Sequence, residues 1–472
     1  MANDLNPQER MAIPPVAMPT RPAAERSSQF DEVETGLSRV QAIREAQRCL
    51  QCRHRPCVEG CPVRVAIPEF IGALAAGDLP TAARILQRDN ALPAVCGRVC
   101  PQERQCQSRC VRLHKDGAVG IGYLERFVAD WAHAHPAEVG ELPRAAASGY
   151  SVAVIGAGPA GLTAAGELAL RGHQVSLFEA LHDTGGVLRY GIPEFRLPKT
   201  IIDIEVGRLK RLGVTVECNV IIGRTLTLEQ LRQEFDAVFL GSGAGLPRLL
   251  EIPGENLKGV YTANEYLTRV NLMRAGRDPQ SPTPVVVGRR VVVVGGGNTA
   301  MDCVRTARRL GAQEAMIVYR RSRAEMPART AEIAHALEEG ISLLELLQPV
   351  EIVGESDGWV RGLRCQKMVL GERDDSGRWR PLPVEGAIVD VVADVVINAL
   401  GNRPNPLLTR TAPELTLLAD GRIPTDANTM TNLPGVFSGG DIVRGGATVI
   451  TAMGDGKQAA AGIDRWLRSR SG

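Results

Sequence analysis

The pattern of apolar and polar positions changes at about Tyr150. Residues 31–135 carry apolar side chains at helical spacing in short segments; one helix is expected over residues 78–89, with Asp78 as its N-cap and Pro80 in its first turn. After Tyr150, short runs of β-branched residues alternate with glycine-rich turns and amphipathic segments. This alternation is typical of α/β folds with parallel strands. The sequence therefore predicts a helical domain followed by an α/β region.

One strand–turn–helix unit occurs twice in the α/β region, starting from glycine-rich turns at Gly156 and Gly295. We therefore expect two Rossmann-like dinucleotide-binding domains, in the arrangement of glutathione reductase and adrenodoxin reductase. The expected divisions are an arm with the helical domain, a first dinucleotide-binding domain, a second one, and a C-terminal return to the first, at residues 1–145, 146–285, 286–400 and 401–472.

The first glycine-rich turn has the context of a dinucleotide site. A buried strand over residues 151–155 leads into G-x-G-x-x-G and then into a helix. The first glycine of this motif allows a tight turn, the second lets backbone N–H groups approach a pyrophosphate, and the third lets helix and strand pack closely. An acid that can bind a ribose hydroxyl ends the next strand, and a glycine pair follows it. The residues assigned to this site are Gly156, Gly158, Pro159, Ala160, Gly161, Glu179 and Gly186.

The second turn follows a strand over residues 290–294 and has alanine as its third small residue, which the motif allows. The next strand ends in two arginines instead of an acid. Guanidinium groups at this position favour the 2′-phosphate of NADPH over NADH, unless they only form a solvated face. The residues assigned to this site are Gly295, Gly297, Asn298, Thr299, Ala300, Arg320 and Arg321.

A second glycine-rich segment near the C-terminus completes the expected flavin site. Asp441 follows Gly440 and can bind a ribityl hydroxyl of FAD, although it can also be an ordinary N-cap. Thr448 and Val449 open a long helix of small residues, whose N-terminus can offset charge on a reduced flavin. The first dinucleotide is therefore expected to be FAD.

The cysteines are clustered, since eight of the 11 lie between Cys49 and Cys110. Two groups of four, each with a Cys-Pro step, are typical of iron–sulfur clusters; two zinc sites are the alternative. Disulfides are not expected in a large chain without an export signal. Of the other three, Cys303 is expected in the core, and Cys218 and Cys365 are expected to be buried.

Overall charge excludes several function classes. The chain has 55 basic and 53 acidic residues, a net charge of +2, so nothing directs it to nucleic acid or to an anionic membrane. No apolar run approaches the ~18 residues of a membrane span, and the start lacks the pattern of a signal peptide. We expect a cytoplasmic protein without nucleic-acid or membrane partners.

Six motifs together resemble the small (β) subunits of NADPH-dependent glutamate synthase, over nearly the whole chain from about Phe30. The wider family includes the large subunit of electron-bifurcating NADH-dependent ferredoxin:NADP oxidoreductase. The segment of residues 120–130 in this chain resembles the bifurcating and stand-alone branch of the family most. The FAD-bearing part of dihydropyrimidine dehydrogenase is a more distant member. The stretches that carry the resemblance are residues 49–52, 60–63, 96–102, 156–161, 297–303 and 439–445.

The resemblance implies FAD, NADPH and two 4Fe-4S clusters, and it places Arg196 near the FAD. Cys96 is then not a ligand, although the spacing alone leaves a pairing of all eight thiolates open. By analogy, the ligands of one cluster are Cys49, Cys52, Cys57 and Cys110, and those of the other are Cys61, Cys100, Cys106 and a side-chain oxygen of Glu125.

The expected reaction is an electron relay. Flavoprotein disulfide reductases carry a pair of redox cysteines near the flavin, whereas Cys218 is the one cysteine between Glu179 and Val291. Electrons from NADPH are therefore expected to leave the flavin through the clusters, and no catalytic side chain is predicted because hydride transfer needs no protein acid or base.

The resemblance implies that the acceptor is a partner, the large glutamate synthase subunit, which makes two glutamates from glutamine, 2-oxoglutarate and NADPH. A ferredoxin-linked subunit and a pyrimidine-reducing subunit are the alternatives. A non-catalytic assembly scaffold is a third hypothesis, and the complete glycine and cysteine sets argue against it.

Overall fold

The computed structural model describes residues 5–276, 278, 280–375 and 377–470. Before residue 151 the described secondary-structure elements are all helices, apart from one isolated bridge between Thr20 and Glu34. As predicted, Asp78 caps its helix by accepting a hydrogen bond from the Thr81 N–H at 3.0 Å. The α-helices are α1 (Pro7–Ala12), α2 (Ala23–Arg26), α3 (Arg39–Gln47), α4 (Pro56–Glu59), α5 (Ile67–Ala75), α6 (Leu79–Asp89), α7 (Pro93–Val99), α8 (Ile121–Ala134) and α9 (Pro136–Val139), and the 3₁₀ turns are η1 (Gln102–Arg104) and η2 (Gln107–Arg109).

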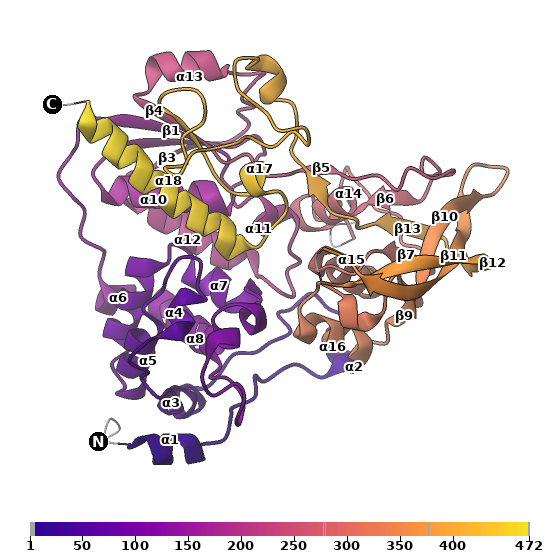
Figure 1. Cartoon of the computed structure of the whole chain (residues 1–472), viewed down its shortest axis with the longest axis horizontal. Helices are drawn as coiled ribbons and strands as arrows, with labels where there is room; N and C mark the ends of the chain where they lie inside the picture. The colour runs from indigo at the N-terminus through magenta and orange to yellow at the C-terminus, as the bar shows by residue number, and fades with distance from the viewer. Residues whose placement is uncertain (1–4, 277, 279, 376, 471–472) are drawn as a thin grey trace.

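The first α/β domain is built on a parallel sheet with the strand order β15-β4-β1-β2-β3. Its strands are β1 (Ser151–Ile155), β2 (Gln174–Phe178), β3 (Thr215–Glu217), β4 (Ala237–Leu240) and β15 (Val436–Ser438). The C-terminal segment returns to this sheet, as expected, because β15 pairs with β4. The helices are α10 (Pro159–Leu170), α11 (Val187–Tyr190), α12 (Lys199–Arg211), α13 (Leu228–Glu234), α17 (Asp441–Arg444) and α18 (Val449–Ser469). In Figure 1, α10 and α18 lie side by side against the sheet.

The second α/β domain repeats the plan with the order β6-β13-β7-β8-β9, also parallel. Its strands are β6 (Val260–Thr262), β7 (Arg290–Val294), β8 (Glu314–Tyr319), β9 (Ser342–Glu345) and β13 (Val395–Asn398), and its helices are α14 (Ala263–Leu267), η3 (Thr268–Leu272), α15 (Asn298–Arg309), η4 (Arg323–Glu325) and α16 (Thr330–Glu338). Since β6 and α14 belong to this domain, it begins before the expected boundary at residue 286. The reason is that β6 pairs with β13, which is distant in the sequence.

An antiparallel sheet that the sequence analysis did not predict interrupts the second domain. It consists of β10 (Leu347–Gly354), β11 (Val360–Arg373) and β12 (Trp379–Val392). The ends of β11 and β12 project from the body of the molecule (Figure 1). A small two-stranded ladder joins the two domains, and its strands are β5 (Leu246–Pro247) and β14 (Asn402–Arg403). The 3₁₀ turn η5 (Thr409–Thr411) follows β14 in the chain.

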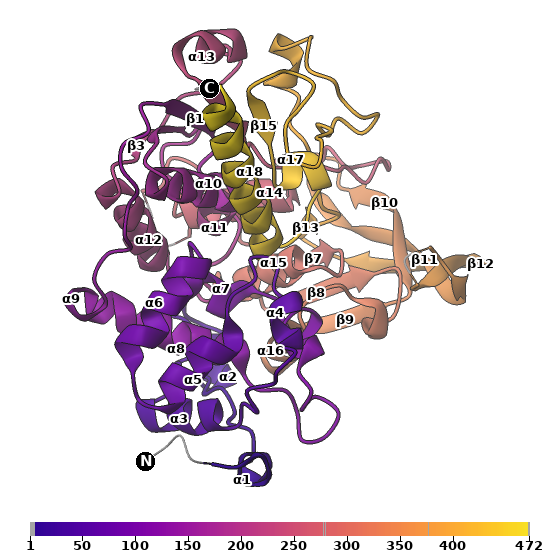
Figure 2. The ribbon, with the colours of Figure 1, turned by 60° about the vertical axis from the view of Figure 1, so that its left-hand side comes forward.

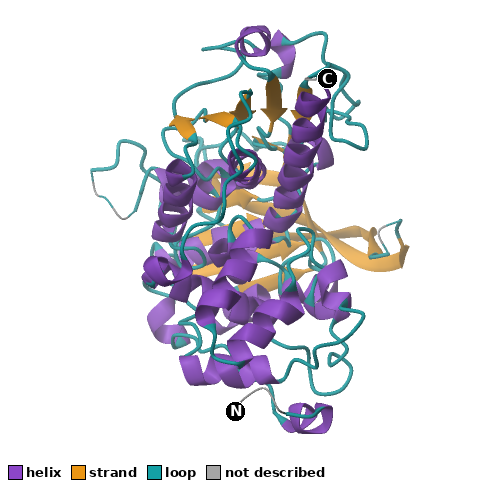
Figure 3. Cartoon of the chain, turned by 90° about the vertical axis from the view of Figure 1, so that its left-hand side faces the viewer, coloured by secondary structure: helices purple, strands orange, loops and turns teal. Residues whose placement is uncertain are grey.

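The helical domain lies against the first α/β domain, and the two share one hydrophobic core (Figure 2). Phe70 and Leu74 of α5, Leu124 of α8, and Val154 and Leu162 of the first dinucleotide unit belong to this single buried cluster. The domains are therefore packed as one body, with helices of both lying side by side in Figure 3. None of the described helices is long and apolar enough to cross a membrane.

Candidate functional site

The first glycine-rich turn has the backbone geometry that the motif requires. Gly156 adopts a φ of +93°, and a side-chain carbon there would lie 2.5 Å from the Gly241 carbonyl oxygen. A carbon on Gly161 would overlap the Gly156 carbonyl oxygen, whereas one on Gly158 would meet nothing within 4 Å. The turn is thus closed on its inner side by packing and open at Gly158, as a backbone that receives a pyrophosphate must be.

Glu179 lies beside this turn. Its two carboxylate oxygens accept hydrogen bonds from the Ala157 N–H at 2.8 Å and the Leu181 N–H at 2.9 Å. Burial raises the pKa of this carboxyl, and the two backbone donors lower it. Gly186 closes onto Gly158, since a carbon on Gly186 would lie 2.9 Å from the Gly158 Cα. Glu179 is therefore held by the backbone and still has acceptor sites for ribose hydroxyls.

The second turn repeats this geometry, with Gly295 and Gly297 in the positions of Gly156 and Gly158. The two arginines that follow β8 differ from each other. Arg320 is exposed, whereas Arg321 is buried and donates to the Trp379 carbonyl oxygen at 2.8 Å and to Asp374 at 2.7 Å. Arg320 is thus the better candidate for a 2′-phosphate, because Arg321 is already bound to the β11–β12 connection.

One cleft of about 1640 Å³ joins the two turns. Of the residues assigned to the dinucleotide sites from the sequence, all line this cleft except Gly161 and Ala300, which pack behind the turns. Val99 and Pro101 of the helical domain also line it, which the sequence did not indicate, although Pro101 directly follows a candidate cluster ligand. No cysteine lines the cleft in the described part of the chain.

The C-terminal segment supplies the third wall of the cleft. Burial raises the pKa of Asp441 to about 6, and Asp441 accepts a hydrogen bond from the Ala447 N–H at 3.3 Å. Asp441 begins the short helix α17 after Gly440, so it is not the N-cap of that helix. Thr448 caps α18 by accepting from the Thr451 N–H, and its hydroxyl also accepts from Gln105 of the helical domain.

Arg196, which the resemblance places near the FAD, lines the cleft, but acids of the second domain already neutralise its charge. Its guanidinium donates to both oxygens of Asp302 at 2.7 and 2.8 Å and lies 3.1 Å from Glu332. Burial raises the pKa of Asp302 to about 6 in spite of this pairing. Arg196 therefore connects the two dinucleotide domains through a buried ion pair.

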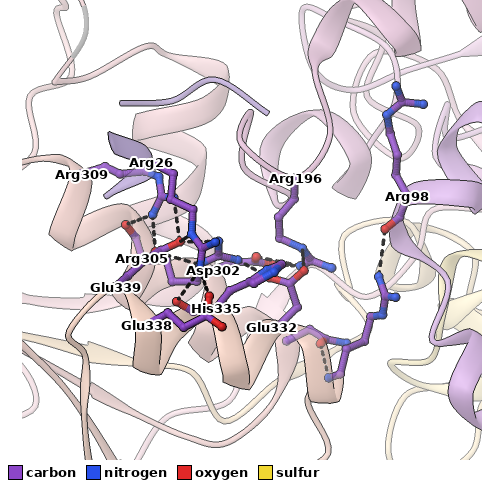
Figure 4. A network of polar contacts seen from close by, with 12 residues as sticks. Arg26, Arg98, Arg196, Asp302, Arg305, Arg309, Glu332, His335, Glu338 and Glu339 are labelled. Atoms are coloured by element: carbon purple, nitrogen blue, oxygen red, sulfur yellow. Dashed lines mark hydrogen bonds and ion pairs between the residues drawn. The ribbon is translucent and has the colours of Figure 1, made fainter. Parts of the chain in front are cut away.

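This ion pair belongs to a larger buried network that includes the N-terminal arm (Figure 4). Arg26 of the arm donates to Glu339 at 3.1 Å and to Glu338, and Arg305 and Arg309 also donate to Glu339. The guanidinium carbons of Arg305 and Arg309 lie 4.8 and 3.8 Å from the Phe195 ring centroid. The N-terminal arm contains two short helices, α1 and α2, and Arg26 of α2 is bound to the second dinucleotide domain.

The first cysteine set surrounds one small apolar cavity. Cys49, Cys52, Cys57 and Cys110 line it together with Ile67 and Ile71. Burial, together with the neighbouring thiols of the set, raises the pKa of Cys49 to about 11 and that of Cys57 to about 12. Four converging thiols are thus brought together by segments distant in the sequence, which fits the ligand set of a 4Fe-4S cluster.

The second set contains a carboxylate. Burial raises the pKa of Cys61 to about 11 and raises that of Cys106, and the nearby Glu125 carboxylate contributes to both shifts. Burial also raises the pKa of Glu125 to about 8. Its Oε1 accepts a hydrogen bond from Asn90 at 2.7 Å, and no ion pair of Glu125 occurs among the described residues. Buried acidic groups without a cation fit a site that binds an iron cluster.

Cys96 lies next to the second set. Its thiol is buried, lies 3.5 Å from the Met453 sulfur, and donates to the side-chain Oδ1 of Asn90 at 3.7 Å. A hydrogen bond with Cys96, followed by burial, raises the pKa of Cys100. Of the cysteines outside the two sets, Cys303 and Cys365 are buried as predicted, but Cys218 is half-exposed because it follows the short edge strand β3.

Two family models match the chain. Residues 26–137 match "Dihydroprymidine dehydrogenase domain II, 4Fe-4S cluster", and residues 150–456 match "Pyridine nucleotide-disulphide oxidoreductase". These matches correspond to the helical domain and to the two dinucleotide domains. They confirm the expected fold class, a helical iron–sulfur domain followed by a flavin and pyridine-nucleotide region.

Relatives match over most of the chain. The glutamate synthase [NADPH] small chain of Azospirillum brasilense is 39% identical over 96% of this chain and 94% of its own length. The beta subunit of the NADP(+)-dependent formate dehydrogenase of Moorella thermoacetica is 40% identical over 88% of this chain and 60% of its own. The structure of Mycobacterium tuberculosis FprA in complex with NADPH superposes with a TM-score of 0.57 at 22% identity, covering 68% of this chain and 85% of that chain, which establishes the fold.

The predicted cofactors, FAD, NADPH and 4Fe-4S clusters, are confirmed for the family by these matches. The prediction of an oxidoreductase is confirmed in the same way. The chain belongs to the family of glutamate synthase small chains, which are NADPH-dependent FAD and iron–sulfur oxidoreductases.

Proposed function

We propose that this chain is an electron-input subunit that oxidises NADPH at FAD and passes the electrons through two 4Fe-4S clusters to the large subunit of a glutamate synthase. The observation that carries the proposal is the single cleft, which joins both dinucleotide turns and reaches Val99 and Pro101 on either side of Cys100. A nicotinamide and a flavin can therefore approach one another within one continuous space, and Cys100 lies between two residues of its wall. FAD supplies the change from two-electron to one-electron transfer when it is bound.

The chain's own residues hold FAD between the first turn and the C-terminal segment. Backbone N–H groups around Gly158 and the N-terminus of α10 face the pyrophosphate, and Glu179 accepts from a ribose. Asp441 is placed for the ribityl chain, and the N-terminus of α18 at Thr448 favours negative charge on the ring. Gly186 backs the pyrophosphate turn.

The second turn is the proposed NADPH site. Gly297 leaves space for the pyrophosphate, and Asn298 and Thr299 line the cleft at the start of α15. Arg320 is exposed and lines the cleft, where it would bind the 2′-phosphate. The side-chain Oδ1 of Asn298 accepts a hydrogen bond from the Arg329 backbone N–H at 2.9 Å, which fixes the Asn298 side chain. Arg321 stabilises the connection between β11 and β12 by its hydrogen bond to Asp374.

The two cysteine sets support two neighbouring clusters. The proposed ligands of the cluster nearer the cleft are Cys61, Cys100, Cys106 and Glu125, and those of the other are Cys49, Cys52, Cys57 and Cys110. The thiols of Cys57 and Cys61 both raise the pKa of Cys106, so the two sets are close in space. Electrons from the cleft would therefore reach the second set, which contains Cys100, and then the first set, which contains Cys49.

The identity of the acceptor rests on the relatives. Those with the widest mutual coverage are named as glutamate synthase small chains, which supports a larger partner subunit. The Moorella relative is named as a formate dehydrogenase subunit, and one family model is named after dihydropyrimidine dehydrogenase. A different acceptor, including a ferredoxin-linked one, is therefore the second candidate.

The test is to purify the native complex without oxygen and to identify its subunits by mass spectrometry. The proposal predicts a large glutamine-dependent flavoprotein in stoichiometric amount, and glutamate formation from glutamine and 2-oxoglutarate with NADPH. A complex that oxidises NADPH but makes no glutamate would contradict the glutamate synthase assignment and leave the electron-input role intact. A chain whose flavin is not bleached by NADPH would contradict both.

A further inference from the structure

A second cavity lies between the helical domain and the first dinucleotide domain, apart from the cleft. Its volume is about 400 Å³, and α8, α9, α10 and α12 bound it; α9, α8 and α12 are grouped at this junction in Figure 2. Much of its wall is aliphatic, with Ala132, Val139, Leu170, Ile204 and Leu209. Small-molecule sites are mostly apolar cavities above about 300 Å³ and are common at domain interfaces. This cavity has that size and position.

Glu205 of α12 brings a buried charge to the cavity. Its side chain is 1% exposed, and neither carboxylate oxygen accepts a hydrogen bond from any described residue. The nearest basic side-chain atoms are His133 Nε2 at 3.5 Å and Arg208 Nη1 at 4.0 Å, without hydrogen-bond geometry. A buried carboxylate without donors is costly, since it has lost its water without replacement.

The other charged groups that line the cavity are already engaged. Glu167 accepts from Arg171 at 2.6 Å, and Glu141 pairs with Arg211 at 3.3 Å at the exposed rim. Arg208 donates to the Ala91 carbonyl oxygen at 2.6 Å. Among the acids of this wall that the structure describes, Glu205 is therefore the buried one with free acceptor sites.

We propose that this cavity binds a small organic cation, an amine or amidine with a compact apolar body. The charged head would donate to Glu205, and the body would pack against Ala132, Leu170 and Leu209. A cation is favoured over a neutral donor because charge-assisted hydrogen bonds to a carboxylate are the stronger ones. A water molecule could satisfy one oxygen but would leave the aliphatic wall unfilled.

The site is connected to both redox regions through the helices that form it. Helix α8 carries Glu125, α10 begins at Pro159 of the first turn, and α12 carries Asp203, which pairs with Arg189 beside the Gly186 loop. A ligand that binds the folded junction and not the unfolded chain stabilises the protein, and above its Kd the stabilisation grows with the logarithm of the ligand concentration. This binding is independent of which acceptor the protein serves.

The test uses the oxygen-free holoenzyme, saturated with NADP+ so that the cleft is occupied. Benzylamine is the probe, and benzyl alcohol is its neutral counterpart. Binding is measured by calorimetry and by the shift of the unfolding temperature. We expect benzylamine to bind saturably, and Glu205→Gln to weaken it by about tenfold to a hundredfold, the loss of one charge-assisted hydrogen bond. The matched variant Glu167→Gln, at a residue already paired with Arg171, should bind benzylamine as the wild type does.

Several results would overturn the proposal: no saturable binding up to about 10 mM, equal binding of benzyl alcohol, or equal binding by the Glu205→Gln and wild-type proteins. A crystal of the wild-type holoenzyme soaked in benzylamine gives a readout that needs no variant. Electron density for the amine within hydrogen-bond distance of Glu205 supports the site. Density elsewhere, or none, contradicts it.

Discussion

The side-chain amide of Gln105 donates a hydrogen bond to the Thr448 hydroxyl at 3.3 Å. Gln105 stands next to Cys106 in the helical domain, and Thr448 caps α18 at the edge of the cleft. The contact therefore joins the residue beside a proposed cluster ligand to the helix end that faces the proposed flavin. Met453 of the same helix touches Cys96, so α18 is packed on the cysteine-bearing segment at more than one place.

Gln105→Leu should slow electron transfer from flavin to cluster without slowing flavin reduction by NADPH. The substitution removes one hydrogen bond, worth about 1 kcal/mol, and loosens the contact between α18 and the helical domain. Stopped-flow absorbance follows the flavin, and rapid-freeze electron paramagnetic resonance follows the clusters. We expect a decrease of a few-fold in the second rate. Equal slowing of both rates would show that the residue acts on the NADPH step instead.

Glu125→Ala should remove one cluster, whereas Cys96→Ala should retain both. The reason is that Glu125 lies among Cys61, Cys100 and Cys106 with Asn90 as its hydrogen-bond donor, while Cys96 already contacts Asn90 and Met453. Iron analysis of the anaerobically purified variants should give about half the wild-type iron for the first variant and the full amount for the second. The reverse result would favour a pairing of thiolates only.

Arg320→Ala should weaken the binding of NADPH without weakening the binding of NADH. Loss of a charge-assisted hydrogen bond to a 2′-phosphate should raise the KM for NADPH about tenfold or more. Arg321→Ala is the matched comparison: it leaves Asp374 without this partner and should lower stability by about 1–3 kcal/mol, with a smaller effect on the cofactor preference. Steady-state kinetics with both nucleotides and thermal unfolding separate the two effects. If Arg321→Ala changes the preference more, the assignment of the two arginines is wrong.

Much of this organisation could be predicted from the sequence because it depends on local patterns. The strands β1 and β7 lie at the expected residues 151–155 and 290–294, since parallel strands buried on both faces need continuous apolar residues. The three residues of β6 are strand formers, but the run is too short to predict a strand without its pairing with β13. The sheet β10–β12 was missed for a related reason: β12 is half-buried or exposed over nearly its whole length, and the sheet is paired antiparallel within an insertion.

The candidate site shows the same division. The glycines and Glu179 could be assigned because one motif contains the turn, the helix start and the following strand. The partners of Arg196 could not be assigned, because Asp302 and Glu332 are far from it in the sequence and no motif describes a buried ion pair between domains. For the same reason the sequence did not distinguish Arg320 from Arg321.

The buried network predicts a dependence of stability on pH through His335. Burial, followed by the charge of Arg305, lowers its pKa from 6.5 to about 4. The unfolded chain therefore binds a proton in this range that the folded chain does not, so stability is lost as the pH falls from 6.5 toward 4. His335→Gln should flatten this decline by about 1–2 kcal/mol, allowing for the partial exposure of the ring.

The measurement for His335 is denaturant unfolding between pH 6.5 and about 5, above the range in which Glu332 and Glu339 take up protons, because their pKa values are about 2 in the folded protein and 4.5 ordinarily. A variant with the wild-type slope would exclude His335 as the source.

Arg26 tests whether the N-terminal arm holds the second dinucleotide domain in place. Its side chain is 2% exposed and donates to Glu338, to Glu339 and to the Arg21 carbonyl oxygen. Arg26→Ala should lower the free energy of unfolding by about 3 kcal/mol, because it removes one partner from a buried charge cluster. Arg26→Lys keeps the charge but not the fork of donors, so it should be intermediate.

The matched control is Arg21→Ala in the same arm. Arg21 is one-third exposed, and its pair with Glu25 lies at the surface, so its loss should cost no more than about 1 kcal/mol. Limited proteolysis adds a local readout: cleavage within the arm should speed up in Arg26→Ala and stay at the wild-type rate in Arg21→Ala. If both variants are cleaved and unfold alike, Arg26 does not fasten the arm, and the orientation of the second domain depends on Arg196 and its two acids instead.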